Sequence, residues 1–232
     1  MIVAQHKELS DLKEMLRNHR KVLAVGCGTC VTVCFAGGQK EVGILSSALR
    51  MASRVNGHEL EIDECVVQRQ CEEEYIEPLE EGLDAYDAIL SFGCGIGVQS
   101  LADRYPRVRV LPALNTTFMG RPTEQGVWEE RCQACGNCVL DRTAGICPVT
   151  RCPKSLFNGP CGGVQDGRCE VDATMPCAWQ LIWERMGELG LMDRLMEIEP
   201  PKDWSTSRDG GVRRIVRDDL RLPEGDDGGS GA

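Results

Sequence analysis

Eight cysteines lie between Cys132 and Cys177, and their spacing constrains what this part of the chain can fold into. The first three follow one another as Cys-Gln-Ala-Cys-Gly-Asn-Cys, and Cys147-Pro148 comes after eight further residues. In a [4Fe-4S] cluster each iron takes one thiolate, so three thiols spaced in this way can bind three different irons. A tetrahedral zinc usually takes two ligands from one CxxC knuckle and two from a distant one. The spacing therefore favours iron–sulfur clusters, with two structural zinc ions as the alternative.

The eight thiols are enough for two complete sets of four ligands. They are Cys132, Cys135, Cys138, Cys147, Cys152, Cys161, Cys169 and Cys177. All three histidines lie outside this segment, at His6, His19 and His58, so mixed Cys/His zinc sites are not expected there.

The composition indicates a cytoplasmic, metal-binding protein rather than a secreted disulfide scaffold. Fourteen cysteines among 232 residues are too sparse for a small scaffold of that kind, and the chain is long enough to bury an ordinary core. The first residues show no basic patch followed by an apolar run, so no signal peptide is expected, and no apolar stretch reaches the length of a membrane span. In a reducing compartment, metal binding is the expected use of the cysteines.

The chain is acidic, with a formal net charge of −10. A protein that binds a nucleic-acid groove is expected to carry a basic stripe, and the sequence shows none. We therefore do not expect a nucleic-acid partner.

Residues 1–120 alternate between strand and helix patterns. Strands are expected at residues 21–26, 59–63, 86–92 and 108–111, and helices begin near Leu9, after Gly37-Gly38, over residues 72–83 and after Gly93. This alternation predicts an α/β fold, with a small parallel sheet between two helical layers. The pattern at Gly93-Cys-Gly-Ile-Gly97 does not meet the GxGxxG rule, so a nucleotide site there is not expected.

The six other cysteines follow the ends of the expected strands. They are Cys27, Cys30, Cys34, Cys65, Cys71 and Cys94. Loops beyond the carboxyl ends of parallel strands meet at one edge of the sheet, so these thiols are expected to converge around a third metal site. The alternative for any one of them is a small buried side chain, a common role of free cysteine.

Residues 121–199 are rich in Gly, Pro and Cys and have little periodicity, which predicts an irregular domain that draws folding free energy from bound metal. A helix beginning near Trp179 and Trp183 is expected to bury Leu181, Ile182 and Met186. Residues 200–232 read as an extended tail, with disorder expected in the last ten residues. In this tail Trp204 could dock onto a partner or fold back on its own domain.

The C-terminal cysteines sit in a series of short motifs. These are Cys132-Gln-Ala-Cys-Gly-Asn-Cys-Val-Leu140, Gly145-Ile-Cys-Pro148, Cys152-Pro-Lys-Ser-Leu156, Asn158-Gly-Pro-Cys-Gly-Gly163, Gly167-Arg-Cys-Glu170 and Cys177-Ala-Trp-Gln180. Together they resemble the cysteine-rich family linked to methylenetetrahydrofolate reductase. The N-terminal half contains Gly26-Cys-Gly-Thr-Cys-Val-Thr-Val-Cys-Phe-Ala-Gly-Gly38 and Leu111-Pro-Ala-Leu-Asn-Thr116, and it is similar to MetV-like iron–sulfur subunits. The resemblance extends to Asp203-Trp-Ser-Thr206.

The resemblance implies two or three [4Fe-4S] clusters, with zinc possible in one site. The eight C-terminal cysteines match the family motifs, and the third ligand set is expected to be Cys30, Cys34, Cys71 and Cys94. Cys27 and Cys65 are then spare thiols, and Cys27 is the better substitute.

The resemblance also implies a division of labour. A MetF-like flavin-containing subunit carries out the hydride chemistry of methylenetetrahydrofolate reductase, and the present chain, without catalytic residues of its own, connects that flavin to a redox donor. The pathway would be the methyl (Wood–Ljungdahl) branch of acetyl-CoA synthesis. The donor could be a ferredoxin, a hydrogenase, a heterodisulfide-reductase-like module or a NADH-oxidising module. Two alternatives stay open: a zinc-binding structural or adaptor subunit of the same complex, and a stand-alone enzyme with an open iron in the N-terminal crevice.

Overall fold

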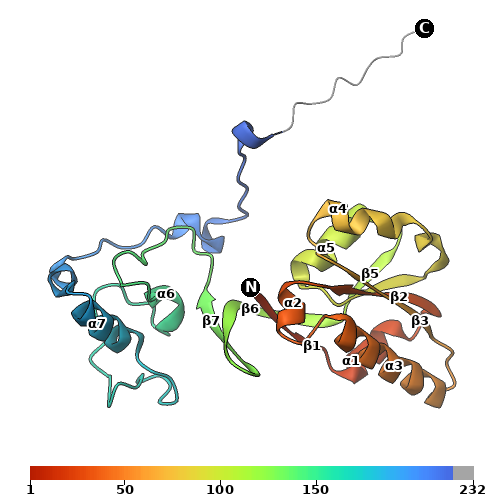
Figure 1. Cartoon of the computed structure of the whole chain (residues 1–232), viewed down its shortest axis with the longest axis horizontal. Coiled ribbons are helices and arrows are strands. Elements are labelled where there is room, and N and C mark those ends of the chain that lie inside the picture. Colours follow the sequence, from red (N-terminus) through yellow and green to blue (C-terminus); the bar gives the residue numbers. More distant parts are fainter. Residues whose placement is uncertain (222–232) are drawn as a thin grey trace, which may run out of the picture. The chain divides into compact units, whose positions relative to one another are not determined.

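The computed structural model describes residues 1–221, which divide into two compact units (Figure 1). The first unit comprises Met1–Gln133 and Cys147–Ser155, and the second comprises Ala134–Ile146 and the chain from Leu156 onward. The first unit thus runs past residue 120, where we expected the N-terminal domain to end. The expected disorder of the last ten residues falls outside the described residues.

A four-stranded parallel sheet forms the centre of the first unit. Its strands are β2 (Lys21–Cys27), β3 (Glu61–Val67), β4 (Ala88–Ser91) and β5 (Arg109–Pro112), in the order β3-β2-β4-β5. Two helices, α1 (Leu9–Leu16) and α3 (Gln39–Val55), lie on one face, whereas α4 (Glu73–Ile76) and α5 (Gly95–Arg104) lie on the other (Figure 1). The predicted α/β fold with a small parallel sheet is confirmed.

The sequence of β2 explains why both faces of the sheet are covered. Successive side chains of a strand point to opposite faces, so an all-apolar strand must be buried on both. Val22 packs in the same apolar cluster as Leu12 of α1 and Leu49 of α3, while Val25 packs in a second cluster with Leu101 of α5. All five side chains are at most 1% exposed.

The helix expected over residues 72–83 is shorter than its pattern. The α-helix α4 ends at Ile76, and a 3-10 helix covers Glu77–Glu80. Pro78 has no N–H for the α-helical ladder, and Gly82 then takes a left-handed conformation with φ 84°.

A second sheet was not predicted from the sequence. It consists of β1 (Ile2–His6), β6 (Leu114–Glu124) and β7 (Val127–Cys132), paired antiparallel in the order β1-β6-β7. The amino-terminal strand pairs with a strand more than a hundred residues away, for example Ile2 with Met119. Such long-range pairing depends on tertiary contacts, whereas β-propensity within each short segment is a weak signal.

The remaining helices are short, apart from one. They are α2 (Cys30–Val33), α6 (Pro148–Arg151), α7 (Ala178–Glu188) and the 3-10 helices Leu83–Ala85, Met192–Met196, Trp204–Thr206, Arg208–Gly210 and Asp218–Leu220. In α7, Ile182 and Met186 are buried, as expected, and so is Trp179. Leu181 is only half-buried, and Trp183 is 53% exposed. Along residues 1–221 no helix is both long and apolar enough to cross a membrane.

Replacing Leu49 tests the packing of α3 on the sheet. We expect Leu49→Ala to lower the free energy of unfolding by about 2–5 kcal/mol, because it leaves a cavity in a closed apolar cluster. The control is Met51→Ala on the exposed side of the same helix, where the side chain is 63% exposed and the loss should stay within about 0.5 kcal/mol. Urea denaturation measures both. Equal losses in the two variants would contradict this packing.

Candidate metal centre

The strand order brings three cysteine-bearing loops to one edge of the parallel sheet. Among the parallel strands, the first in the chain, β2, lies between the second, β3, and the third, β4, so the direction of strand addition reverses at β2. Ligand sites of open parallel sheets form beyond the carboxyl ends of the strands at such a switch point. Cys27 ends β2, Cys71 follows β3, and Cys94 lies directly before α5.

The side-chain amide of Gln70 connects these three strand ends by hydrogen bonds. The side chain is fully buried, and its Nε2 donates to the carbonyl oxygens of Val25 at 2.7 Å and Gly26 at 3.2 Å. Its Oε1 accepts a 2.6 Å hydrogen bond from the Ser91 hydroxyl, which in turn accepts from the Gly93 N–H at 3.1 Å. Buried polar groups that are fully paired fix a unique arrangement of the segments that carry them. Gln70 therefore fixes the backbone beside Cys71.

Two glycines allow the loops to approach this closely. A side chain at Gly37 would overlap the carbonyl oxygen of Phe92, and one at Gly93 would overlap Oε1 of Gln70. Gly37 belongs to the loop after β2 and Gly93 to the loop after β4, so both contacts join loops from different strands. Glycine is required here for space rather than for turn geometry.

Cys71 is near two other thiols. Burial raises the pKa of Cys71, and the neighbouring Cys27 and Cys94 raise it further. Of the four residues expected to form the third ligand set, Cys71 and Cys94 therefore lie close enough to interact electrostatically, and the spare thiol Cys27 lies within the same range of Cys71.

The other two residues of that set are placed differently. Cys30 begins α2, and Cys34 follows the same short helix. The Cys34 thiol is 7% exposed, packs in the apolar core and donates to the carbonyl oxygens of Val31 at 3.5 Å and Ala4 at 3.6 Å. Burial raises the pKa of Cys34. The Cys34 sulfur therefore makes its contacts inside the apolar core.

Cys65 lies within β3 rather than after it, because the strand extends to Val67. It packs against the apolar cluster on the α5 face of the sheet, and burial raises the pKa of Cys65 to about 11. It thus lies within the sheet and not in a strand-end loop.

The eight C-terminal cysteines are shared between the two units. Cys132, Cys147 and Cys152 belong to the first unit, and the second contains Cys135, Cys138, Cys161, Cys169 and Cys177. Backbone hydrogen bonds place two of the latter on a small hairpin: Cys169 N–H donates to Met175 at 3.0 Å and Cys177 N–H to Gly167 at 2.8 Å. Cys177 also caps the amino end of α7.

A segment from the C-terminal part holds the loop between Cys135 and Cys138. We call residues 199–213 the strap. Lys202 Nζ donates to the Asn137 carbonyl oxygen at 2.6 Å, and the Thr206 hydroxyl donates to that of Cys135 at 2.9 Å. Arg213 donates to the Ala134 carbonyl oxygen. The strap therefore binds three carbonyl oxygens of a tight cysteine loop.

The loop itself has an uncommon backbone that the strap accommodates. Ala134 has φ 51° and Gly136 has φ 81°, both in the left-handed region. A side chain at Gly136 would overlap the Thr206 carbonyl oxygen, so only glycine fits beneath the strap. Trp204, whose role the sequence left open, folds back within this unit and packs edge-on against Phe157, with ring centroids 6.5 Å apart.

The donor set is chemically suited to iron–sulfur clusters or zinc, since every candidate ligand is a thiol. Among residues 1–221, no three Cys, His, Asp or Glu side chains are arranged so that they could hold a metal ion. Thiol-rich loops with few apolar contacts commonly reach their final arrangement only when metal binds. The ligand sets therefore stay predictions from spacing and family resemblance.

Sequence reasoning missed the polar residues that position these loops. Gln70, Lys202, Thr206 and Arg213 read as ordinary surface residues in the sequence. The only signal was position: Gln70 directly precedes Cys71, and Thr206 ends the part of the chain covered by the resemblance.

Removing the Gln70 amide should loosen all three strand ends. We expect Gln70→Leu to lower the free energy of unfolding by about 1–3 kcal/mol, because the Ser91 hydroxyl and two carbonyl oxygens lose their buried partner. Gln99→Leu, at an exposed glutamine of α5, is the control and should cost at most about 0.5 kcal/mol. Denaturation curves that coincide for the two variants would refute the role of Gln70.

The raised pKa of Cys65 predicts a loss of stability in alkali. The unfolded thiol ionises near its ordinary pKa of 9.0, whereas the folded thiol keeps its proton until about pH 11. The folded state then binds more protons in this range, so the free energy of unfolding falls as the pH rises from 9 toward 11. In Cys65→Ala this decline should be smaller than in the wild type, as measured by urea denaturation at a series of pH values. Parallel declines would show that Cys65 does not contribute.

Comparison with known proteins relates one part of the chain to a family. No curated protein and no solved structure matches the chain. Residues 111–205 match the model of the family described as the C terminal of methylene-tetrahydrofolate reductase. This stretch includes all eight C-terminal cysteines and the strap up to Ser205. The cysteine-rich part of the chain is therefore similar to the C-terminal segment of methylene-tetrahydrofolate reductase, over less than half of the chain.

Proposed function

We propose that the chain is an iron–sulfur electron-transfer subunit of a methylenetetrahydrofolate reductase. It would relay electrons between a redox donor and the flavin of a MetF-like catalytic subunit, in the methyl branch of the acetyl-CoA pathway. The observation that carries this proposal is that eight regularly spaced cysteines lie inside the segment that matches the reductase family. The chain is acidic and all its candidate ligands are thiols, which fits an electron-transfer subunit better than an enzyme that transfers hydride.

The C-terminal cysteines would hold two [4Fe-4S] clusters, which supply one-electron carriers when bound. The contribution of the chain is to position thiolates and backbone amides. In the loop at Cys135, three carbonyl oxygens are bound by Lys202, Thr206 and Arg213. Engaging the carbonyl groups in this way fixes the backbone of the loop, and hydrogen bonds from backbone N–H groups to sulfur tune cluster potentials.

The N-terminal edge of the sheet would hold a third cluster. Cys71 and Cys94 are the best-placed members of the predicted set of Cys30, Cys34, Cys71 and Cys94, and the proximity of Cys27 to Cys71 supports Cys27 as a replacement for the core-packed Cys34. Gln70 would keep this site in place, since its hydrogen bonds join the three strand ends.

The expected partners follow from this role. One is the flavin-containing reductase subunit, and the other is a donor: a ferredoxin, a hydrogenase, a heterodisulfide-reductase-like module or a NADH-oxidising module. We assign no catalytic acid or base to this chain, because the chemistry of folate reduction would take place on the partner.

Metal analysis of protein purified without oxygen tests the proposal. We expect about eight to twelve irons per chain, from four irons in each of two or three clusters, with matching sulfide and an EPR signal after reduction. In Cys135→Ser, iron should fall by about four per chain, while the flavin subunit keeps its activity with artificial dyes. Cys65→Ala, the matched control in a half-buried strand position, should keep its iron.

Two results would contradict the proposal. A folded, colourless protein that contains zinc and no iron would favour the zinc-binding structural or adaptor subunit instead. Loss of dye-linked activity in Cys135→Ser without loss of iron would show that electron transfer and hydride chemistry do not reside on separate chains.

A further inference from the structure

The second unit contains a cavity that the proposed electron-transfer role does not use. Its volume is about 500 Å³, within the range of about 300–1,000 Å³ typical of small-molecule sites. Aromatic side chains line it from two segments: Phe157 lies before α7, and Trp179 and Trp183 lie on that helix. Arg142, Arg194 and Glu197 supply charged groups.

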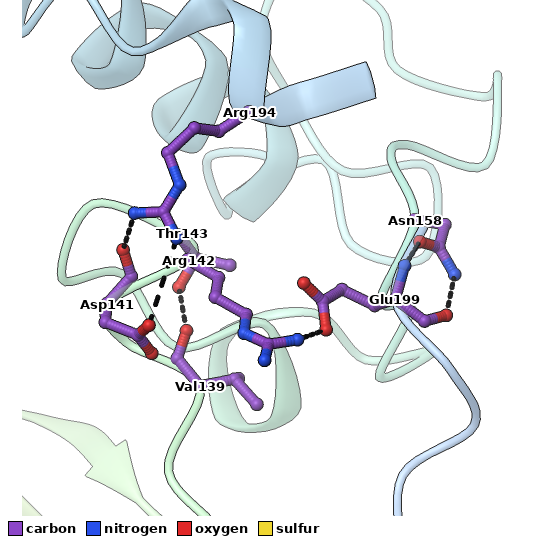
Figure 2. Close-up of polar contacts among 7 residues, drawn as sticks. All are labelled: Val139, Asp141, Arg142, Thr143, Asn158, Arg194 and Glu199. Carbon is purple, nitrogen blue, oxygen red and sulfur yellow. Dashed lines mark hydrogen bonds and ion pairs between the residues drawn. The ribbon is translucent and has the colours of Figure 1, made fainter. Parts of the chain in front are cut away.

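Hydrogen bonds and an ion pair between three segments of the chain hold the walls of the cavity. Figure 2 shows Arg142 donating to the Glu199 carboxylate, whose side chain is only 16% exposed. The Asn158 amide pairs with the backbone of Glu199 in both directions, at 3.0 Å and 2.8 Å. These contacts join the chain near residue 142, the loop at 158 and the beginning of the strap. The cavity walls are therefore fixed without a ligand.

A second arginine of the cavity lining, Arg194, contacts Asp141. Arg194 Nη1 donates to the Asp141 carbonyl oxygen at 3.1 Å, and its Nη2 lies 4.0 Å from the Asp141 carboxylate (Figure 2). A guanidinium has five N–H donors, so most of those on Arg194 are available to a ligand.

Two further residues of the lining, Trp183 and Glu197, have polar groups that a ligand could contact. Trp179 is 5% exposed, and its indole N–H donates to the Leu156 carbonyl oxygen at 3.0 Å, so it is part of the wall. In contrast, Trp183 is 53% exposed. Within residues 1–221, neither the Trp183 indole N–H nor the Glu197 carboxylate has a hydrogen bond or ion pair. An exposed indole therefore lines the cavity together with a carboxylate and an arginine.

These three groups define the chemistry of a ligand. An exposed indole favours a flat ring, since stacking on it buries apolar area. Arginine donates to a carbonyl oxygen and a carboxylate accepts from an N–H, so Arg194 and Glu197 suit a ring edge that carries both. We propose that this cavity binds a fused-ring heteroaromatic compound, with its ring on Trp183 and its C=O/N–H edge between Arg194 and Glu197. Purines, pterins and flavins share this chemistry.

Titration calorimetry on the full chain, purified without oxygen, tests the proposal and distinguishes the sources. The probes are GMP, folinic acid and FMN, with inorganic phosphate and glutarate as anions that lack a ring. We expect at least one ring compound to bind with a Kd below about 1 mM, and neither of the simple anions to do so. The probe that binds best identifies the class as purine, pterin or flavin.

Variants then locate the binding site. We expect Trp183→Ala to weaken binding about tenfold, in line with the energy of stacking on an aromatic side chain. Arg194→Gln should weaken it as well, whereas Arg214→Gln removes the same charge from an exposed position outside the cavity and should change nothing. Because Trp183 is exposed, its replacement should leave the fold intact, and circular dichroism checks this.

Three outcomes would overturn the proposal. The first is that none of the three ring compounds binds. The second is that phosphate or glutarate binds as tightly as the ring compounds, so that the site selects charge alone. The third is that Trp183→Ala, with its fold retained, binds as well as the wild type. Iron is measured on the same preparation. A protein loaded with iron that binds no ring compound overturns this proposal alone, whereas a folded protein without iron that binds one overturns the electron-transfer proposal alone.

Discussion

The buried amide of Gln70 links the fold of the first unit to its candidate metal site. One side chain donates to the end of β2 and accepts from Ser91 at the end of β4, while its own backbone belongs to the loop after β3. An unpaired amide at a fully buried position would be costly, so this arrangement holds only when all three strand ends are in register. The loops that carry Cys27, Cys71 and Cys94 are thereby fixed by a group that is not itself a candidate ligand. The close approach at Gly37 and Gly93 belongs to the same arrangement.

The two units reach order by different means. The sheet and its helices bury two apolar clusters, which is the ordinary source of stability for a domain of this size. The cysteine-rich part of the second unit relies on polar contacts between distant segments, such as those of the strap with the carbonyl oxygens near Cys135. Metal bound to such a segment would add stability, because metal–thiolate bonds would replace an apolar core. The metal binding proposed for the cysteine-rich segment would then be coupled to its folding.

The second unit also combines two features with separate chemistry. The cysteine loops and the strap suit a cluster, whereas the aromatic cavity between α7 and the beginning of the strap suits a flat organic ligand. Both use the strap: Lys202 and Thr206 contact the cysteine loop, and Glu199 completes the cavity frame. A ligand in the cavity and a cluster beside the loop would therefore act on neighbouring parts of the same segment.

The sequence by itself determined the α/β class, the parallel strands and the cysteine spacing, because hydrophobic periodicity and ligand spacing are local properties. It placed β2 and α7 well. The convergence of thiols from successive strands on one metal site stays a prediction. Only the tertiary structure decided which of these thiols are neighbours. It brought Cys27 to Cys71, turned Cys34 into the core and placed Cys65 inside β3. It also decided the pairing of β1 with β6, the role of Gln70 and the path of the strap. Each of these depends on contacts between residues far apart in the chain, and the free energy of such contacts is set by the packing of the whole unit rather than by any local pattern.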